Sequence, residues 1–301
     1  FGDSGGALLQ FVDRPELDRA GVILPPAVLD GIERHVLGIA RHAELLRASG
    51  QHLKRGVLLY GAPGAGKTHT IRYLIGQLQG TTVIVISGAA LGWISEACSV
   101  ARTLQPSVVV IEDVDLIAED RESYGGEQPL LFQLLNEMDG LGADADVTFL
   151  LTTNRADLLE GALAARPGRV DHAAEIPIPD SAARRRLIEL YRGSLILDLA
   201  DPDLVVSRTE GVTASFLKEL LRRAALIAAE KAAGAGGTYG TGGADRSGGA
   251  DGAGGTAAGG PLRVTDADMT VALDQLLDTR SQLTRVLLGR AGARPGMAPA
   301  P

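Results

Sequence analysis

The glycine-rich stretch at residues 61–68 contains the residue types that hold a nucleoside triphosphate. It reads Gly61-Ala62-Pro63-Gly64-Ala65-Gly66-Lys67-Thr68 and matches the G-x-x-x-x-G-K-[ST] pattern in full. The glycines let backbone N–H groups turn toward phosphate oxygens, and the start of a following helix adds partial positive charge. Lys67 is expected to reach the β- and γ-phosphates, and Thr68 to bind Mg²⁺ through its hydroxyl. We therefore predict an ATP site that spans residues 61–69 and ends at His69.

A second candidate is the pair of carboxylates at Glu112 and Asp113, which directly follows the apolar run Val108–Ile111. In nucleoside triphosphatases such a strand lies beside the phosphate-binding loop, where one carboxylate serves Mg²⁺ and another polarises the attacking water. Two acidic residues can also end a strand at the protein surface. The P-loop pattern in the same chain favours the catalytic interpretation.

The elements that must position these residues are predicted by apolar runs that alternate with helical stretches. Such a pattern indicates a parallel sheet covered by helices on both faces. Residues 22–49, with apolar residues at helical spacing, are expected to form a helical lead-in. The predicted strands are Val57–Tyr60, Val83–Ile86, Val108–Ile111, Val147–Leu151 and a weaker one near Ala174–Ile178.

After Pro177 and Pro179 the pattern predicts helices only, at Ser181–Tyr191, at Ser215–Lys231 and from Thr265 onward. The segment 234–260 is so rich in glycine that it cannot bury enough apolar surface to offset its ordering entropy, and we predict that it is disordered. The expected organisation is a flexible linker at 1–20, a nucleotide-binding domain at 21–178, a helical lid at 179–289 and a disordered tail at 290–301.

Five motifs in a fixed order resemble those of the AAA ATPases, and the resemblance covers roughly residues 20–289. It implies a P-loop NTPase α/β fold, with a doubly wound parallel five-stranded sheet followed by a small all-helical lid domain. It also implies Mg²⁺-dependent ATP hydrolysis by a homo-oligomeric ring, a hexamer, that remodels or disassembles protein substrates. The motifs are the P-loop, Ile111–Asp115, Leu134–Leu141, Thr152–Arg155 and Arg166–Arg169.

The resemblance assigns roles to individual residues. Asn154 corresponds to the sensor that orients the attacking water, and Asp139–Leu141 to the segment that signals to the neighbouring subunit. Arg166 and Arg169 correspond to arginine fingers, which reach the ATP site of the next subunit and neutralise charge on the transferred phosphoryl group. Gly211–Ser215 resembles the small-residue segment that approaches the nucleotide, although a simple helix start explains it equally well.

The chain departs from the family pattern at two places. Most members carry Asp and then Glu after the acidic strand, whereas this chain has Glu112 and then Asp113. We therefore expect Glu112 to join Thr68 in binding Mg²⁺, and Asp113 to take the catalytic role with a side chain one methylene shorter. The segment after the second strand is also shorter than the family pattern. Trp93 within it is either an aromatic residue that grips substrate or a packing anchor.

Composition limits the alternatives. A net charge of −8 without a basic block argues against duplex nucleic acid as the main partner, and Arg184–Arg186 is expected to be a solvated helix face. No apolar run is long enough to span a bilayer, and the single cysteine, Cys98, fits a reducing cytoplasm. The start at Phe1 leads us to expect a fragment that lacks an N-terminal domain.

Three rival functions remain open on the sequence alone. The chain could be an ATP-gated assembly or scaffold protein that hydrolyses slowly or not at all, which the inverted acidic pair and the shortened segment favour. A nucleic-acid-associated loader is disfavoured by the acidic charge. A P-loop kinase is disfavoured because Arg166 and Arg169 would have no purpose in it.

Overall fold

The computed structural model describes residues 10–115, 129–142, 145–157, 170–235 and 261–291. The chain divides into two compact units: the first runs through Ala183 and includes Thr213–Ser215, and the second comprises Arg184–Val212 and the residues from Phe216 onward. The predicted arginine fingers Arg166 and Arg169 lie outside the described residues. So do most of the predicted Gly-rich segment and tail, and part of the predicted linker.

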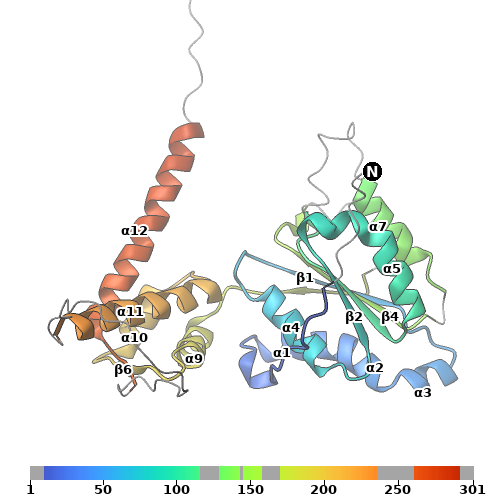
Figure 1. Ribbon diagram of the computed structural model, residues 1–301, viewed down its shortest axis with the longest axis horizontal. Coiled ribbons are helices and arrows are strands. Elements are labelled where there is room, and N and C mark those ends of the chain that lie inside the picture. Colours follow the sequence, from blue (N-terminus) through green and yellow to red (C-terminus); the bar gives the residue numbers. More distant parts are fainter. Residues whose placement is uncertain (1–9, 116–128, 143–144, 158–169, 236–260, 292–301) are drawn as a thin grey trace, which may run out of the picture. The chain divides into compact units, whose positions relative to one another are not determined.

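The first unit is built on a five-stranded sheet in which all neighbouring strands are parallel (Figure 1). Its order is β2-β3-β4-β1-β5, which agrees with the predicted doubly wound parallel sheet. The fifth strand ends at Glu175, earlier than expected, because its register partner Tyr60 is the last residue of β1. The strands are β1 (Arg55–Tyr60), β2 (Thr82–Ile86), β3 (Ser107–Ile111), β4 (Val147–Thr153) and β5 (His172–Glu175).

Helices cover both faces of this sheet (Figure 1). Successive strand residues point to opposite faces, so Val109 packs toward one helical layer and Val110 toward the other. One layer contains α5 (Ile94–Thr103) and α7 (Pro129–Asp139), and the 3-10 helix η3 (Gly88–Trp93) precedes α5. The other contains α1 (Pro26–Glu33), the π-helical segment η2 (Arg34–Gly38), α2 (Ile39–Arg41) and α4 (Lys67–Gln77). The short helix α3 (Ala43–Ala48) follows α2 and has no buried residue. The predicted helical lead-in is thus confirmed.

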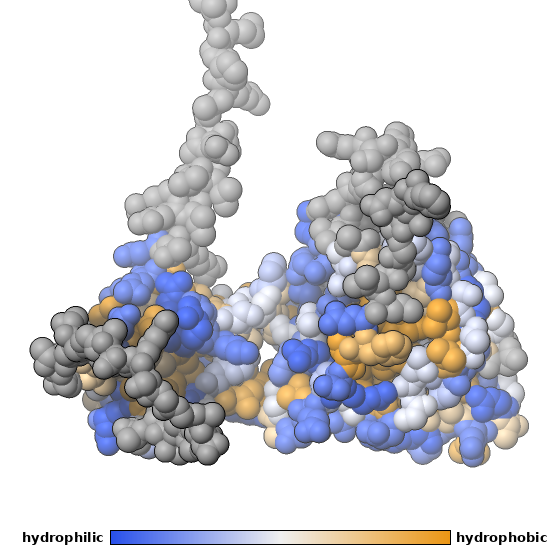
Figure 2. All heavy atoms as spheres, in the orientation of Figure 1, coloured by the Kyte–Doolittle hydropathy of each residue, from blue (hydrophilic) through white to orange (hydrophobic). Residues whose placement is uncertain are grey.

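The sheet has an apolar edge at β2. Val85 in this strand is 49% exposed, and Figure 2 shows apolar surface over this part of the first unit. Trp93, at the end of η3, is 40% exposed, so both interpretations of its role stay predictions. Exposed apolar strand edges are typical of surfaces that pack against another polypeptide.

The second unit contains α10 (Pro202–Arg208), most of α11 (Ala214–Ala235) and α12 (Asp266–Ala291), and α9 (Ser181–Tyr191) enters it from the first unit. The start of α12 is capped as its sequence predicts, because Thr265 donates to Asp268 Oδ2 from both its backbone N and its Oγ1. None of the helices in the described part of the chain combines the length and hydropathy that a bilayer crossing requires.

Two features of the second unit differ from the expectation of helices only and a solvated arginine face. A parallel pair, β6 (Ile196–Asp198) and β7 (Arg263–Thr265), lies among the helices; three-residue strands are too short to give a periodic signal. Arg184 points inward and is 6% exposed, and its Nε donates to Val206 O at 3.1 Å. The arginine stem packs in the helical core, so residues 184–186 do not form a continuous basic face.

Candidate functional site

The loop between β1 and α4 has the backbone conformation that phosphate binding requires. Its glycines at 61, 64 and 66 all have positive φ, at 145°, 75° and 122°. At Gly61 a Cβ would lie 2.4 Å from Ile176 O, so only glycine fits there. The loop ends where α4 begins at Lys67, which confirms the predicted strand–loop–helix order.

The ammonium group of Lys67 is held by three acceptors. Nζ donates to Gly61 O at 2.8 Å, to Ala62 O at 3.0 Å and to Asn154 Oδ1 at 2.8 Å. Burial lowers the pKa of Lys67, and the nearby Asp113 and Asp115 carboxylates oppose that shift. An ammonium has three donors, so these three acceptors use its whole hydrogen-bonding capacity.

Asn154 joins Lys67 to the acidic strand. It follows β4 directly, and its Nδ2 donates to Asp113 Oδ1 at 3.2 Å. Asp113 adopts a left-handed backbone with φ of 53°, an arrangement that costs on the order of 1 kcal/mol for a residue other than glycine. Its backbone N donates to Thr152 Oγ1 at 3.0 Å, which holds it in this conformation. The three side chains Lys67, Asn154 and Asp113 therefore form one hydrogen-bonded row, named here the lysine–asparagine–aspartate row.

Asp115 fixes the position of Asn154 through hydrogen bonds, a role that the sequence did not predict. It is 7% exposed, and its Oδ1 accepts from Thr153 Oγ1 at 2.9 Å and from the backbone N of Asn154 at 3.1 Å. Strand periodicity could not reveal this role, because β3 ends at Ile111 and the chain turns at Asp113, whose φ is 53°.

A cavity of about 440 Å³ opens in front of the row. Glu112 is half-buried but does not line the cavity, so its assignment as a Mg²⁺ ligand stays a prediction. Arg72 was not anticipated; it lies four residues after Thr68, on the same face of α4. The lining residues are Pro63, Gly64, Gly66, Lys67, Thr68, His69, Arg72, Asp113, Asn154 and Ser215.

Two further residues of the cavity wall are fixed by backbone contacts. His69 lines the cavity while its Nε2 contacts Gly21 O at 2.9 Å, so the lead-in segment sets the position of its ring. Ser215, which groups with the first unit, donates its backbone N to Gly64 O at 3.1 Å. The segment predicted to approach the nucleotide thus contacts the P-loop.

Comparison with known proteins decides the family. The sequence pattern of the ATPase family associated with various cellular activities (AAA) matches residues 57–178. Residues 57–178 are an AAA ATPase domain. This segment contains all of β1 except its first two residues, the whole of β2 through β5, and every residue of the lysine–asparagine–aspartate row.

The relatives of this AAA domain come from archaea, bacteria and humans. A proteasome-activating nucleotidase of Thermococcus onnurineus is 32% identical over 201 residues, which are 62% of this chain and 50% of that protein. The ATP-dependent zinc metalloprotease FtsH 2 of Symbiobacterium thermophilum is 34% identical over 65% of this chain and 36% of its own length. The human ATPase family gene 2 protein homolog A is 33% identical over 66% and 24%, respectively. The aligned part of the chain spans half or less of each of these relatives.

Proposed function

We propose that this chain binds ATP in the cavity beside the P-loop and hydrolyses it as one subunit of a ring that remodels protein substrates. The observation that carries the proposal is the lysine–asparagine–aspartate row, because it lines the cavity with a phosphate-binding cation, a polar amide and a carboxylate. The names of two relatives, a proteasome-activating nucleotidase and an ATP-dependent zinc metalloprotease, support a nucleotide-driven action on proteins.

In this proposal the loop residues Gly61–Thr68 hold the phosphates with their backbone N–H groups, and Lys67 binds the β- and γ-phosphates. The described residues contain no cluster of three or more His, Cys, Asp or Glu side chains that could hold a metal by itself. Mg²⁺ would therefore be bound by phosphate oxygens together with protein oxygens. The exposed Thr68 hydroxyl at the cavity wall is suited to be one of the protein ligands.

The catalytic carboxylate is assigned to Asp113, because it lines the cavity and Glu112 does not. The Asp113 carboxylate accepts a hydrogen bond from the Asn154 amide. This bond fixes both side chains beside the position of an attacking water. Arg166 and Arg169 complete the site from a neighbouring subunit, and a hexameric ring is the assembly that places them there. A cytoplasmic location, expected from the single cysteine, belongs to the same proposal.

The test is steady-state ATP hydrolysis as a function of protein concentration, for the parent and for Asp113→Asn and Arg169→Ala. Specific activity should rise with concentration, and each variant should lose most of it. Arg192→Ala is the matched control, since it removes an arginine just after α9 in the second unit, where it pairs with Glu189 and donates to Leu195 O.

Mixing the two inactive variants tests the composite site directly. A mixed ring contains some sites with an intact Asp113 and an intact neighbouring Arg169, so activity should partly return. Turnover that stays flat with concentration and negligible in every sample would contradict the proposal.

A further inference from the structure

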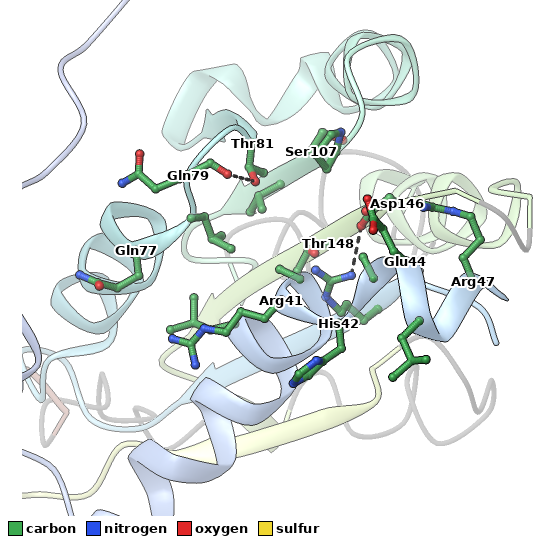
Figure 3. A pocket seen from close by; sticks show the side chains of 18 residues that line it. Arg41, His42, Glu44, Arg47, Gln77, Gln79, Thr81, Ser107, Asp146 and Thr148 are labelled. Carbon is green, nitrogen blue, oxygen red and sulfur yellow. Dashed lines mark hydrogen bonds and ion pairs between the residues drawn. The ribbon is translucent and has the colours of Figure 1, made fainter. Parts of the chain in front are cut away.

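A second cavity, of about 680 Å³, lies at the amino ends of β1, β3 and β4 (Figure 3). Its floor includes Arg55, Asp146 and Thr148, and its walls come from α2, α3 and the segment after α4. The volume lies within the roughly 300–1,000 Å³ of small-molecule sites. The P-loop follows the other end of β1, roughly 17 Å away along five residue steps, so the two cavities are separate.

Arg55 at the floor is a buried cation whose hydrogen-bonding capacity is only partly used. It is 4% exposed, and its Nη1 donates to Leu53 O at 2.6 Å and to Asp146 Oδ1 at 3.3 Å. Neither Nε nor Nη2 donates to any residue that the structure describes. The edge formed by Nε and Nη2 is the edge that a carboxylate or a phosphate can contact with two oxygens at once.

Thr148 provides a second unpartnered group beside it. Arg55 and Thr148 are register partners in β1 and β4, and Thr148 is fully buried. Within the described part of the chain, the hydroxyl Oγ1 of Thr148 forms no hydrogen bond. Unpartnered buried polar groups are rare in folded proteins, so two adjacent ones at one cavity favour a polar ligand there.

The charges around the cavity favour an anion. Asp146 is the shared counterion of two guanidinium groups, at 3.3 Å from Arg55 and 3.8 Å from Arg47. Arg41 also lines the wall and forms no hydrogen bond or ion pair with any described residue. Three arginines therefore face two carboxylates, Asp146 and Glu44, and Figure 3 shows the labelled members of this group around the same hollow.

We propose that this cavity binds a small molecule through a carboxylate or phosphate group. The oxyanion contacts the Nε–Nη2 edge of Arg55 and accepts a hydrogen bond from the Thr148 hydroxyl. The positive charges of Arg41 and Arg47 neutralise its negative charge. A carboxylate and a phosphate both offer oxygen acceptors, and these match the unpartnered N–H groups of Arg55 and the hydroxyl of Thr148. The inference does not depend on ATP hydrolysis at the P-loop.

The experiment titrates the full chain with inorganic phosphate and, separately, with succinate, by calorimetry at constant ionic strength. Lys67→Ala is the background, because it removes phosphate binding at the P-loop. Replacing both Arg41 and Arg47 by Ala should raise the Kd at least about tenfold, since each removes a charge-assisted contact. The matched control is Arg185→Ala with Arg192→Ala, two arginines of the second unit that form ion pairs with Asp203 and Glu189.

Thr148→Val separates binding from folding. It removes a hydroxyl that has no partner, so the ligand-free variant should unfold at the same temperature as its background or a higher one. The same variant should bind the probe several-fold more weakly. Binding of either probe with this dependence supports the site. The proposal is overturned if neither probe binds, or if the control pair weakens binding as much as the Arg41 and Arg47 variants do.

Discussion

Removing the Asn154 side chain should tighten ADP binding and slow ATP hydrolysis at the same time. All three donors of the Lys67 ammonium are occupied in the ligand-free protein, and Asn154 is the only side chain among their acceptors. A phosphate that binds Lys67 must displace at least one acceptor. Asn154 is the acceptor that can leave without a change in the P-loop backbone. ADP is the informative ligand because it has no γ-phosphate for Asn154 to contact.

The magnitude follows from the bond that is lost. A hydrogen bond to a charged group contributes about 1.5–3 kcal/mol, and the half-buried Asn154 amide recovers part of this from water once it is released. A net effect near 1.4 kcal/mol corresponds to about a tenfold lower Kd for ADP in Asn154→Ala. Turnover should fall because Asp113 loses the amide that orders it.

Calorimetric ADP titration of the parent, Asn154→Ala and Asn154→Asp measures this effect. The aspartate variant is the matched control: it keeps a partner for Lys67, strengthens that pair and adds negative charge near the phosphates. ADP should therefore bind more weakly to it than to the parent. If Asn154→Ala binds ADP no more tightly than the parent, the Lys67–Asn154 contact does not compete with the nucleotide, and the reasoning is refuted.

Three further predictions concern stability and reactivity. Asp115→Ala should lower the free energy of unfolding by about 2–3 kcal/mol in urea, because it leaves the Thr153 hydroxyl and a backbone N–H without an acceptor, and Asp115→Asn should lose less. The pKa of His172 is lowered in the folded protein, by burial first and by His35 second, so the unfolded chain takes up a proton first as the pH falls below about 6.5. The free energy of unfolding should therefore decrease between pH 7 and 5, and His172→Phe should reduce that decrease; an equal decrease in both proteins would contradict it. Burial raises the pKa of the Cys98 thiol to about 12, so a thiol reagent at pH 8 should modify it only as fast as the protein unfolds, and rapid labelling of the native protein would contradict this.

The sheet and the P-loop could be predicted because their signals are local. Continuous β-branched runs such as Val108–Ile111 identify buried parallel strands, and the spacing of glycines before Lys67 fixes the phosphate loop. The carboxyl ends of parallel strands lie at one edge of the sheet, so the meeting of Asp113 and Asn154 with Lys67 follows once those strands are assigned.

The remaining features depend on contacts that residue types do not specify. The inward turn of Arg184 and the pairing of β6 with β7 arise from tertiary packing between segments far apart in the sequence. The free edge of Arg55 is also invisible in the sequence, because an arginine before a strand is ordinarily an exposed side chain. Only the register of β1 with β4 places it beside Thr148.

The inverted order of Glu112 and Asp113 is coupled to the backbone and is not a simple exchange of two side chains. Asp113 has a φ of 53°, and aspartate tolerates this left-handed region better than most residues because its short side chain can hydrogen-bond locally. The conformation brings a short carboxylate to Asn154 Nδ2 and to the cavity wall. A glutamate at this position would have to adopt the same φ at a higher energetic cost, or let the strand end relax and lose the Thr152 contact. The identity of residue 113 and the backbone that carries it therefore support one another, and swapping the two acids would not by itself create the arrangement that most family members have.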